Sequence, residues 1–187
     1  MTVEQEVLAR VIGLLTDLSI PYMIAGSLAS SFHGRPRTTH DADIVIDPAP
    51  EPLDRLVGEL SAAHLYVDLA VAREALRDRR QFNVIDATTA FKLDLIIRKD
   101  RPFNLEEFAR RQPAEVAGLP IVLATAEDTI LSKLEWAKKG GGSERQLADV
   151  AGIVDVKGPE LDLEYIHRWA VALGVLDLWS RASGTEG

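Results

Sequence analysis

Two aspartates, Asp41 and Asp43, are separated by one residue where the largely apolar segment 42–47 begins. Successive side chains of a strand point to opposite faces, so these carboxylates would project from the same face about 6.6 Å apart. Two negative charges held this close raise each other's pKa unless a cation lies between them. Mg²⁺ takes hard oxygen ligands and keeps substrate phosphates in its shell. The pair therefore predicts a magnesium site, although an isolated Asp-x-Asp is more often a solvated strand edge.

A short apolar segment, 22–25, runs into the pair Gly26-Ser27. A helix is expected over 27–33, with Ser27 as its N-cap and Gly34 as its stop signal. Glycine lets a phosphate approach the backbone closely, and a helix N-terminus offers unpaired N–H groups with a partial positive charge. The Ser27 hydroxyl could donate a hydrogen bond to the same phosphate. The pair predicts a phosphate-binding turn.

A third acid, Asp94, lies inside the apolar segment 91–97. A carboxylate near a protein core is costly unless it is hydrogen-bonded or bound to a metal ion. Together with the phosphate-binding turn, the three acids suit nucleotidyl transfer, in which a hydroxyl displaces pyrophosphate from a nucleoside triphosphate (NTP). Asp41 and Asp43 would hold Mg²⁺ and the triphosphate. Asp94 would help to hold a second metal ion and act as general base towards the hydroxyl.

Apolar periodicity predicts strands and helices up to residue 124 and helices alone beyond it. The helices are expected at 2–18, 27–33, 51–63 and 70–79, and the strands at 22–25, 42–47, 82–86, 91–97 and within 114–123. The C-terminal helices are expected at 125–138, 143–155 and 162–180, the last broken near Gly174. The predicted fold class is α/β (α+β), a mixed sheet flanked by helices. The predicted domains are a core, 1–124, and a helical C-terminal subdomain, 125–187, packed on it.

Bulk composition excludes several classes of protein. The 187 residues carry a formal net charge of −8, which argues against non-specific coating of nucleic acid, because phosphate binding needs a positive field. Cysteine is absent, so disulfide and thiol chemistry are excluded. No apolar run approaches the roughly 20 residues that span a bilayer. The N-terminus lacks the apolar stretch of a signal peptide, which predicts a cytoplasmic protein without membrane partners.

The segment 25–43 resembles the signature of the DNA polymerase β-like nucleotidyltransferase superfamily, and within it the AbiEii-type bacterial branch. That branch has a Gly-Ser or Gly-Gly pair, an alanine, His-Gly, Arg-x-Thr and Asp-x-Asp at similar spacing. Here these positions are Gly26-Ser27, Ala29, His33-Gly34, Arg37, Thr39, Asp41 and Asp43. Lys133 on one predicted helix, followed by Arg145 and Asp149 on the next, also resembles the C-terminal helices of that branch. Between residues 48 and 124 only the Asp94 strand fits.

The resemblance implies a nucleotidyltransferase fold, ATP or another NTP as donor, and one or two Mg²⁺ ions. The residues expected to bind the nucleotide are Gly26, Ser27, Arg37, Thr39 and Lys133. The catalytic and metal-binding residues expected are Asp41, Asp43 and Asp94. Several members of the branch are toxins of toxin–antitoxin pairs and some modify tRNA, which implies a tRNA or protein acceptor and a cognate antitoxin.

Several alternatives remain open on the residues alone. The acceptor could be a small molecule, as in an aminoglycoside-modifying adenylyltransferase, or the chain could be a non-catalytic nucleotide-binding regulatory module. Arg37 could pair with an acid instead of a phosphate, and Lys133 could be a solvated helix residue, while Asp149 is expected to brace Lys133 or Arg145. His33 is expected to be a packed residue. Two basic groups could hold RNA if they flank the cleft: Arg73, Arg77, Arg79 and Arg80, and Arg98, Lys99 and Arg101.

Overall fold

The computed structural model of the chain describes residues 2–39, 41–116 and 118–184. These residues form two compact units. Unit 1 comprises the residues up to Ile24 together with Thr39–Leu123, and unit 2 comprises Ala25–Thr38 together with the residues from Ala124 onward. Residues 25–38 therefore group with the C-terminal helices, whereas the predicted division had assigned them to the core. As a statement about domains, the division into 1–124 and 125–187 stays a prediction.

Unit 1 contains the β-sheet and the helices that cover one of its faces. Its elements in chain order are α1 (Val3–Asp17), β1 (Tyr22–Ala25, whose last residue begins unit 2), β2 (Asp41–Ile46), α3 (Pro50–Ala62), β3 (Leu65–Tyr66), α4 (Leu69–Asp78), β4 (Gln81–Asp86), β5 (Lys92–Ile97), α5 (Pro102–Arg110), β6 (Gln112–Val116) and β7 (Leu119–Leu123). A capping box of Thr2 and Gln5 starts α1, and prolines in the first turns of α3 and α5 suit helix N-termini.

The described strands form one seven-stranded mixed sheet in the order β3-β4-β5-β2-β1-β7-β6. β2 and β5 pair in parallel at the centre, as do β1 and β7. The hairpins β4–β5 and β6–β7 are antiparallel, as is the short pair β3–β4. Strands that are distant in sequence thus lie next to each other, which brings the polar residues of segments 41–46 and 92–97 together.

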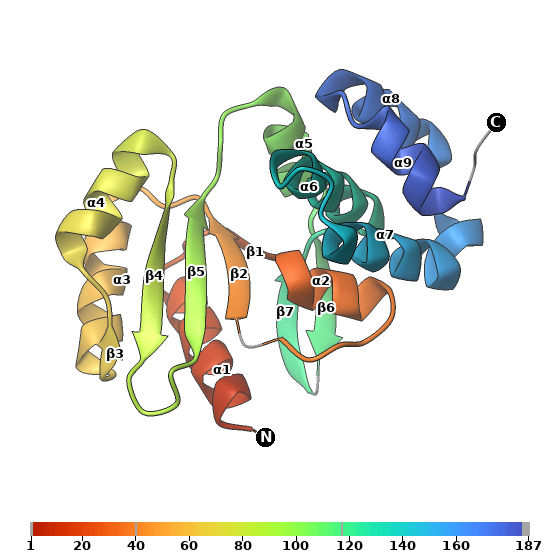
Figure 1. The fold of residues 1–187 in the computed structure, drawn as a ribbon. Coiled ribbons are helices and arrows are strands. Elements are labelled where there is room, and N and C mark those ends of the chain that lie inside the picture. Colours follow the sequence, from red (N-terminus) through yellow and green to blue (C-terminus); the bar gives the residue numbers. More distant parts are fainter. Residues whose placement is uncertain (1, 40, 117, 185–187) are drawn as a thin grey trace. The chain divides into compact units, whose positions relative to one another are not determined.

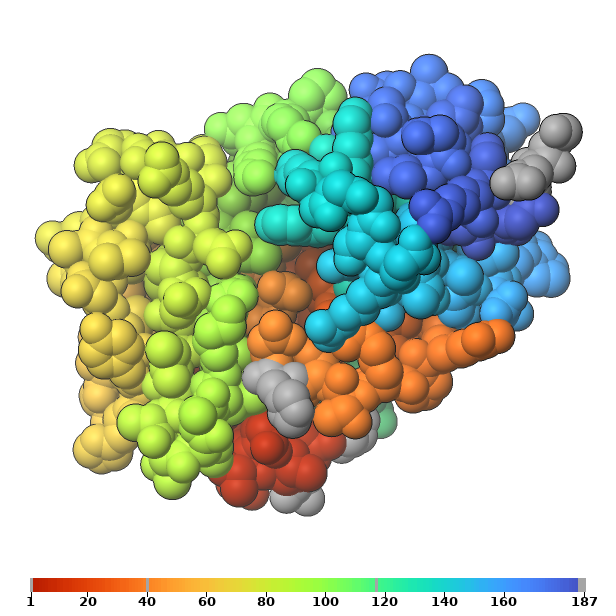
Figure 2. Space-filling view, in the orientation of Figure 1, coloured from red at the N-terminus to blue at the C-terminus, as the bar shows by residue number. Residues whose placement is uncertain are grey.

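The two faces of the central strands differ in chemistry. One face is apolar, with side chains such as Ile44, Leu93 and Leu95 fully buried. Figure 1 shows α1 and α3 lying behind the sheet, against this face. The other face carries polar residues, among them the exposed Gln81 and Asn83 of β4. In Figure 2 the yellow-green atoms of this part of the chain are exposed on the viewer's side. The alternation that predicted the strands therefore reflects one covered and one polar face.

Unit 2 is helical. Its elements are α2 (Gly26–His33), α6 (Ala126–Lys139), α7 (Glu144–Lys157), the 3₁₀ turn η1 (Gly158–Glu160), α8 (Leu163–Leu173) and α9 (Leu176–Ser183). The Thr125 hydroxyl caps α6 by accepting from the Asp128 N–H, as the sequence predicted. Asp128 is fully buried, and its carboxylate accepts from the hydroxyls of Thr125 at 2.6 Å and Tyr165 at 2.5 Å. These hydrogen bonds connect the start of α6 to α8.

The predicted fold class is confirmed: a mixed sheet flanked by helices is followed by a helical C-terminal part. The helix α5 was missed, because Glu107 is buried on the same helix as Phe103 and Phe108 and obscures the apolar period. The N-cap assigned to Ser27 was wrong. Helix α2 begins one residue earlier, with Ala25 as its N-cap and no side-chain cap hydrogen bond. Within the described residues, no helix is both long and apolar enough to cross a membrane.

Gly34 ends α2 at a close approach between two helices of unit 2. A Cβ at Gly34 would lie 2.8 Å from the carbonyl carbon of Gly152 and from the Ile153 nitrogen, both backbone atoms of α7. We expect Gly34→Ala to lower the free energy of unfolding by about 2 kcal/mol, because backbone cannot move aside as a side chain can. Gly13→Ala is the matched control: its Cβ would meet open space on α1 and should stabilise by about 1 kcal/mol or less. Urea denaturation measures both, and equal effects would contradict this packing.

Candidate active site

The polar face of unit 1 brings three predicted acids together. In the parallel pair β2–β5, Asp43 lies opposite Asp94 and Asp41 lies opposite Lys92. Residues opposite each other in a sheet project from the same face, and neighbouring strands are about 4.8 Å apart. Asp41, Asp43 and Asp94 therefore share one face, as predicted. Asp94 is the most enclosed of them, with its side chain 9% exposed.

Lys92 stands among these acids and was not assigned a role from the sequence. Its Nζ donates to Asp94 Oδ2 at 2.8 Å. This hydrogen bond raises the pKa of Lys92 above its ordinary value; partial burial opposes the shift, and the charges of Asp94, Asp41 and Asp43 add to it. Lys92 is therefore a firmly protonated cation on an acidic face. The available sequence signal was its position two residues before Asp94, which places both side chains on one face of β5.

The donor atoms on this face suit a hard divalent cation. Asp94 Oδ1 is buried and has no hydrogen-bond partner among the described residues, which is a costly state for a carboxylate oxygen. Thr39 Oγ1 donates to Asp41 Oδ1 at 2.6 Å and holds that carboxylate in place. Carboxylate oxygens are the ligands that Mg²⁺ takes in proteins. In this conformation, however, no three acidic or histidine side chains in the described part of the chain converge on one ion position.

Unit 2 contains a second polar cluster, centred on Asp149 of α7. Arg37 donates from Nε and Nη2 to the two carboxylate oxygens of Asp149, at 2.9 and 3.0 Å. Lys133 of α6 donates from Nζ to Asp149 Oδ2 at 2.8 Å. Arg37 Nη2 also donates to the Ser27 hydroxyl at 2.6 Å. The side chains of Lys133 and Asp149 are 6% and 8% exposed, so this is a buried ion-pair cluster.

These contacts show the partners of Lys133 and Arg37 in this structure, whereas their roles in nucleotide binding stay predictions. Lys133 is buried and braced by Asp149, as expected for Asp149, and is not a solvated helix residue. Arg37 pairs with an acid, and the Ser27 hydroxyl accepts its hydrogen bond. Gly26 has a φ of 59°, in the left-handed region that favours glycine, where the chain leaves β1. Of the predicted site residues, unit 1 contains Thr39 and the three acids, whereas unit 2 contains Gly26, Ser27, Arg37 and Lys133.

His33 is a packed residue, as expected. It is 3% exposed, and its Nε2 lies 2.7 Å from the Ala124 carbonyl oxygen, so that nitrogen carries the proton. Burial lowers the pKa of His33 despite this hydrogen bond. His33 in the unfolded chain, with a pKa of about 6.5, therefore binds a proton more readily than His33 in the folded chain. The folded state is fully favoured above that pH, and its free energy of unfolding decreases as pH falls below it.

We therefore expect His33→Gln to flatten the decrease in unfolding free energy between pH 7 and pH 5.5. The exposed His167 provides the matched control, His167→Gln. Urea denaturation at the two pH values measures the difference. A wild-type slope that persists in His33→Gln would contradict the burial argument.

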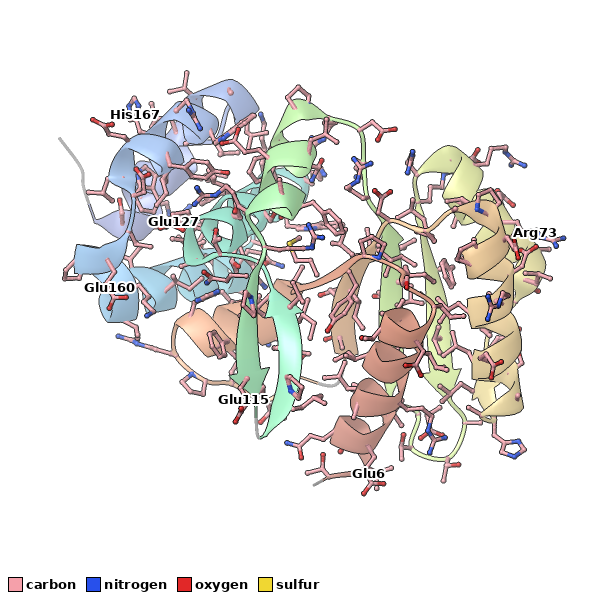
Figure 3. All side chains as sticks on the ribbon, turned by 180° about the vertical axis from the view of Figure 1, so that it is seen from behind. Glu6, Arg73, Glu115, Glu127, Glu160 and His167 are labelled. Carbon is pink, nitrogen blue, oxygen red and sulfur yellow. The ribbon has the colours of Figure 1, made fainter. Side chains whose placement is uncertain are left out.

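In the two basic groups proposed for RNA, Arg73, Arg77, Arg79 and Arg98 pair with neighbouring carboxylates. Arg73 on α4 pairs with Asp54 on α3, at the outer side of unit 1 (Figure 3). The remaining pairs described are Arg77–Asp78, Arg79–Asp47, Arg79–Asp100, Arg98–Asp47 and Arg98–Asp100. Arginines that already share carboxylates offer a weaker field to phosphates. This arrangement gives no support to an RNA-binding surface on unit 1.

The fold is similar to that of solved nucleotidyltransferase structures. ANT(2")-Ia in complex with adenylyl-2"-tobramycin matches with a TM-score of 0.60 at 15% identity, over 92% of this chain and 97% of that one. An antigenic nucleotidyltransferase-like protein from Paracoccidioides brasiliensis matches with a TM-score of 0.58 at 18% identity, over 96% and 91%. The lincosamide antibiotic adenylyltransferase LnuA, lincomycin-bound, matches with a TM-score of 0.56 at 10% identity, over 80% and 95%. No protein-family model and no curated protein sequence matches the chain.

The chain thus has a nucleotidyltransferase fold, with a mixed sheet and a helical C-terminal part. At these identities the likeness establishes the fold. The narrower resemblance to the AbiEii-type branch rests on the sequence motif and stays a prediction, as do the roles of the individual site residues.

Proposed function

We propose that the chain is a Mg²⁺-dependent nucleotidyltransferase that transfers a nucleoside monophosphate from an NTP to a hydroxyl acceptor. The observation that carries this proposal is the register of β2 and β5, which sets Asp43 beside Asp94 and puts Asp41 on the same face. Asp94 Oδ1 is buried and has no hydrogen-bond partner in the described chain, so a cation bound at this face would satisfy it. The nucleotidyltransferase fold supplies the structural setting.

In the proposed reaction the acceptor oxygen forms a bond to the α-phosphorus of the NTP. The bond from that phosphorus to the oxygen bridging to the β-phosphate breaks, and pyrophosphate leaves with the bonding electron pair. Asp94 takes the acceptor's proton as general base, once its carboxylate is released from Lys92. Asp41, Asp43 and Asp94 are the proposed ligands of one or two Mg²⁺ ions, which when bound would stabilise negative charge on the phosphates.

Gly26, Ser27, Arg37, Thr39 and Lys133 are proposed to assist nucleotide binding. The positive φ of Gly26 supports this role at the start of α2, whereas Arg37 and Lys133 would have to share their charge with Asp149. Thr39 is proposed to act through Asp41, whose carboxylate it orients. Calorimetry with a non-hydrolysable NTP analogue and Mg²⁺ tests the assignment. Ser27→Ala should weaken analogue binding, while Ser180→Ala, on the C-terminal helix α9, should not.

The acceptor class is tested directly by labelling. Purified protein is incubated with each of the four [α-³²P]NTPs and Mg²⁺, together with a tRNA fraction, a protein extract or a panel of small hydroxylated compounds. Transfer of label to tRNA or to a protein would support a macromolecular acceptor. If expression also stops growth and the neighbouring gene relieves it, the chain would be the toxin of a toxin–antitoxin pair. Tight NTP binding without Mg²⁺ dependence or transfer would instead indicate a regulatory module.

A small-molecule acceptor is the second candidate, and two observations favour it. Arg73, Arg79 and Arg98 of unit 1 are paired with carboxylates, which weakens the case for RNA. Two of the similar structures are ANT(2")-Ia in complex with adenylyl-2"-tobramycin and the lincosamide antibiotic adenylyltransferase LnuA bound to lincomycin. The net charge of −8 is compatible with a cationic acceptor. Transfer of label to an aminoglycoside, with resistance of cells that express the chain, would establish this alternative.

A further inference from the structure

We infer that Lys92 is a built-in counter-cation of the acidic face, which a divalent ion must displace from Asp94 before it binds. This inference rests on the proposed function, because it assumes that Asp41, Asp43 and Asp94 bind the metal. It adds a residue that opposes metal binding from within unit 1. Lys92 is thus a positioning residue: it sets the state of Asp94 and has no contact with substrate in this role.

The geometry supports the exchange. Lys92 is opposite Asp41 across the β2–β5 pair and two residues before Asp94 on β5, so its side chain stands on the face that carries all three acids. Its ammonium occupies one oxygen of Asp94, Oδ2, at 2.8 Å. The other oxygen, Oδ1, is buried and without a hydrogen-bond partner in the described chain. Oδ2 is therefore already bound to a cation, whereas Oδ1 is available to a second one.

Charge and exposure explain why the ammonium can be exchanged. Without a cation, three carboxylates on one face would repel one another. Lys92 supplies one positive charge, which is enough to lower this repulsion but less than the charge of Mg²⁺. Its side chain is 39% exposed on a flexible stem, so it can withdraw to solvent without an uncompensated burial cost. A divalent ion that binds Asp94 would therefore compete with Lys92 for the same oxygens.

The test compares wild type with Lys92→Met, which keeps the length of the stem and removes the charge. Mn²⁺ alone is the probe, followed by electron paramagnetic resonance of the free ion. We expect Lys92→Met to bind Mn²⁺ about tenfold more tightly, since a like charge a few ångströms from the metal is removed. In EDTA the variant should melt at a lower temperature than wild type, and saturating Mn²⁺ should raise its melting temperature by more than it raises that of wild type.

Lys157→Met is the matched control: it also removes one lysine charge, from the exposed pair with Glu160 in unit 2, and should leave Mn²⁺ affinity unchanged. Glu160 is labelled in Figure 3. Equal or weaker Mn²⁺ binding by Lys92→Met, with wild type binding normally, would overturn the role of Lys92 and leave the proposed metal site standing. Absence of Mn²⁺ binding by wild type would overturn both. Melting temperatures in EDTA that are equal for wild type and Lys92→Met would also overturn the counter-cation.

Discussion

Asp43→Asn is expected to reduce nucleotidyl transfer by about a thousandfold or more, while the chain stays folded. The substitution keeps the shape of the side chain but removes a charge beside Asp94, at the centre of the proposed metal site. Metal ions supply several kcal/mol of charge stabilisation in phosphate transfer, and about 4 kcal/mol corresponds to a thousandfold in rate. The measurement is release of label from [α-³²P]NTP to the acceptor identified in the labelling experiment.

A matched control separates this effect from a change in surface charge. Asp54→Asn makes the same substitution on α3 of the same unit, where the carboxylate pairs with the exposed Arg73. It should alter the rate by no more than about twofold, as surface substitutions change little. Full transfer by Asp43→Asn, with Mg²⁺ dependence retained, would show that the acids on β2 and β5 do not form the site.

Asp149→Ala is expected to have the largest effect on stability, lowering the free energy of unfolding by about 3–5 kcal/mol. The change leaves Lys133 buried without its carboxylate partner and removes both ion-pair hydrogen bonds from Arg37 to that carboxylate. Breaking one partner of a buried ion pair costs more than the pair contributes, because an uncompensated charge remains. The double variant Lys133→Met with Asp149→Ala should therefore recover part of the loss. Urea denaturation at pH 7 measures both.

The control for Asp149→Ala lies on the same helix. Asp155 pairs with Arg35 at the surface, with side chains 51% and 75% exposed, and Asp155→Ala should cost about 1 kcal/mol or less. Burial opposes ionisation of Asp149, yet the hydrogen bonds from Arg37 and Lys133 outweigh it and lower its pKa below 3.8. Its stabilising contribution is thus present above the unfolded pKa and is lost as pH falls below about 4. Equal costs for the two variants at pH 7 would contradict the buried cluster.

The face shared by the three acids was predictable in part. Alternation along a strand is local, so the common face of Asp41 and Asp43 follows from their spacing. That Asp94 stands beside Asp43 depends on the parallel pairing of β2 and β5, which are separated in sequence by two helices and two other strands. A single sequence carries no register information for such a pair. Lys92 was not assigned a role, although its spacing from Asp94 places both side chains on one face of β5.

The other differences from the sequence prediction have one local cause and one cause distant in sequence. The start of α2 depends on the left-handed backbone of Gly26, a conformation that residue types permit but do not dictate. This shifted the helix by one residue and made Ser27 an acceptor for Arg37 instead of a cap. The grouping of residues 25–38 with the C-terminal helices depends on contacts distant in sequence, including the approach of Gly34 to Gly152. Periodicity describes one element at a time and does not contain such contacts.

The central claim is that the carboxylates of β2 and β5 hold a divalent ion for nucleotidyl transfer. The most direct measurement is a crystal structure with Mn²⁺ and a non-hydrolysable NTP analogue, in which anomalous scattering locates the metal. We predict an anomalous peak about 2.1 Å from oxygens of Asp41 and Asp43, shared with the triphosphate. Mn²⁺ and the analogue bound elsewhere, with Asp41 and Asp43 untouched, would contradict the account.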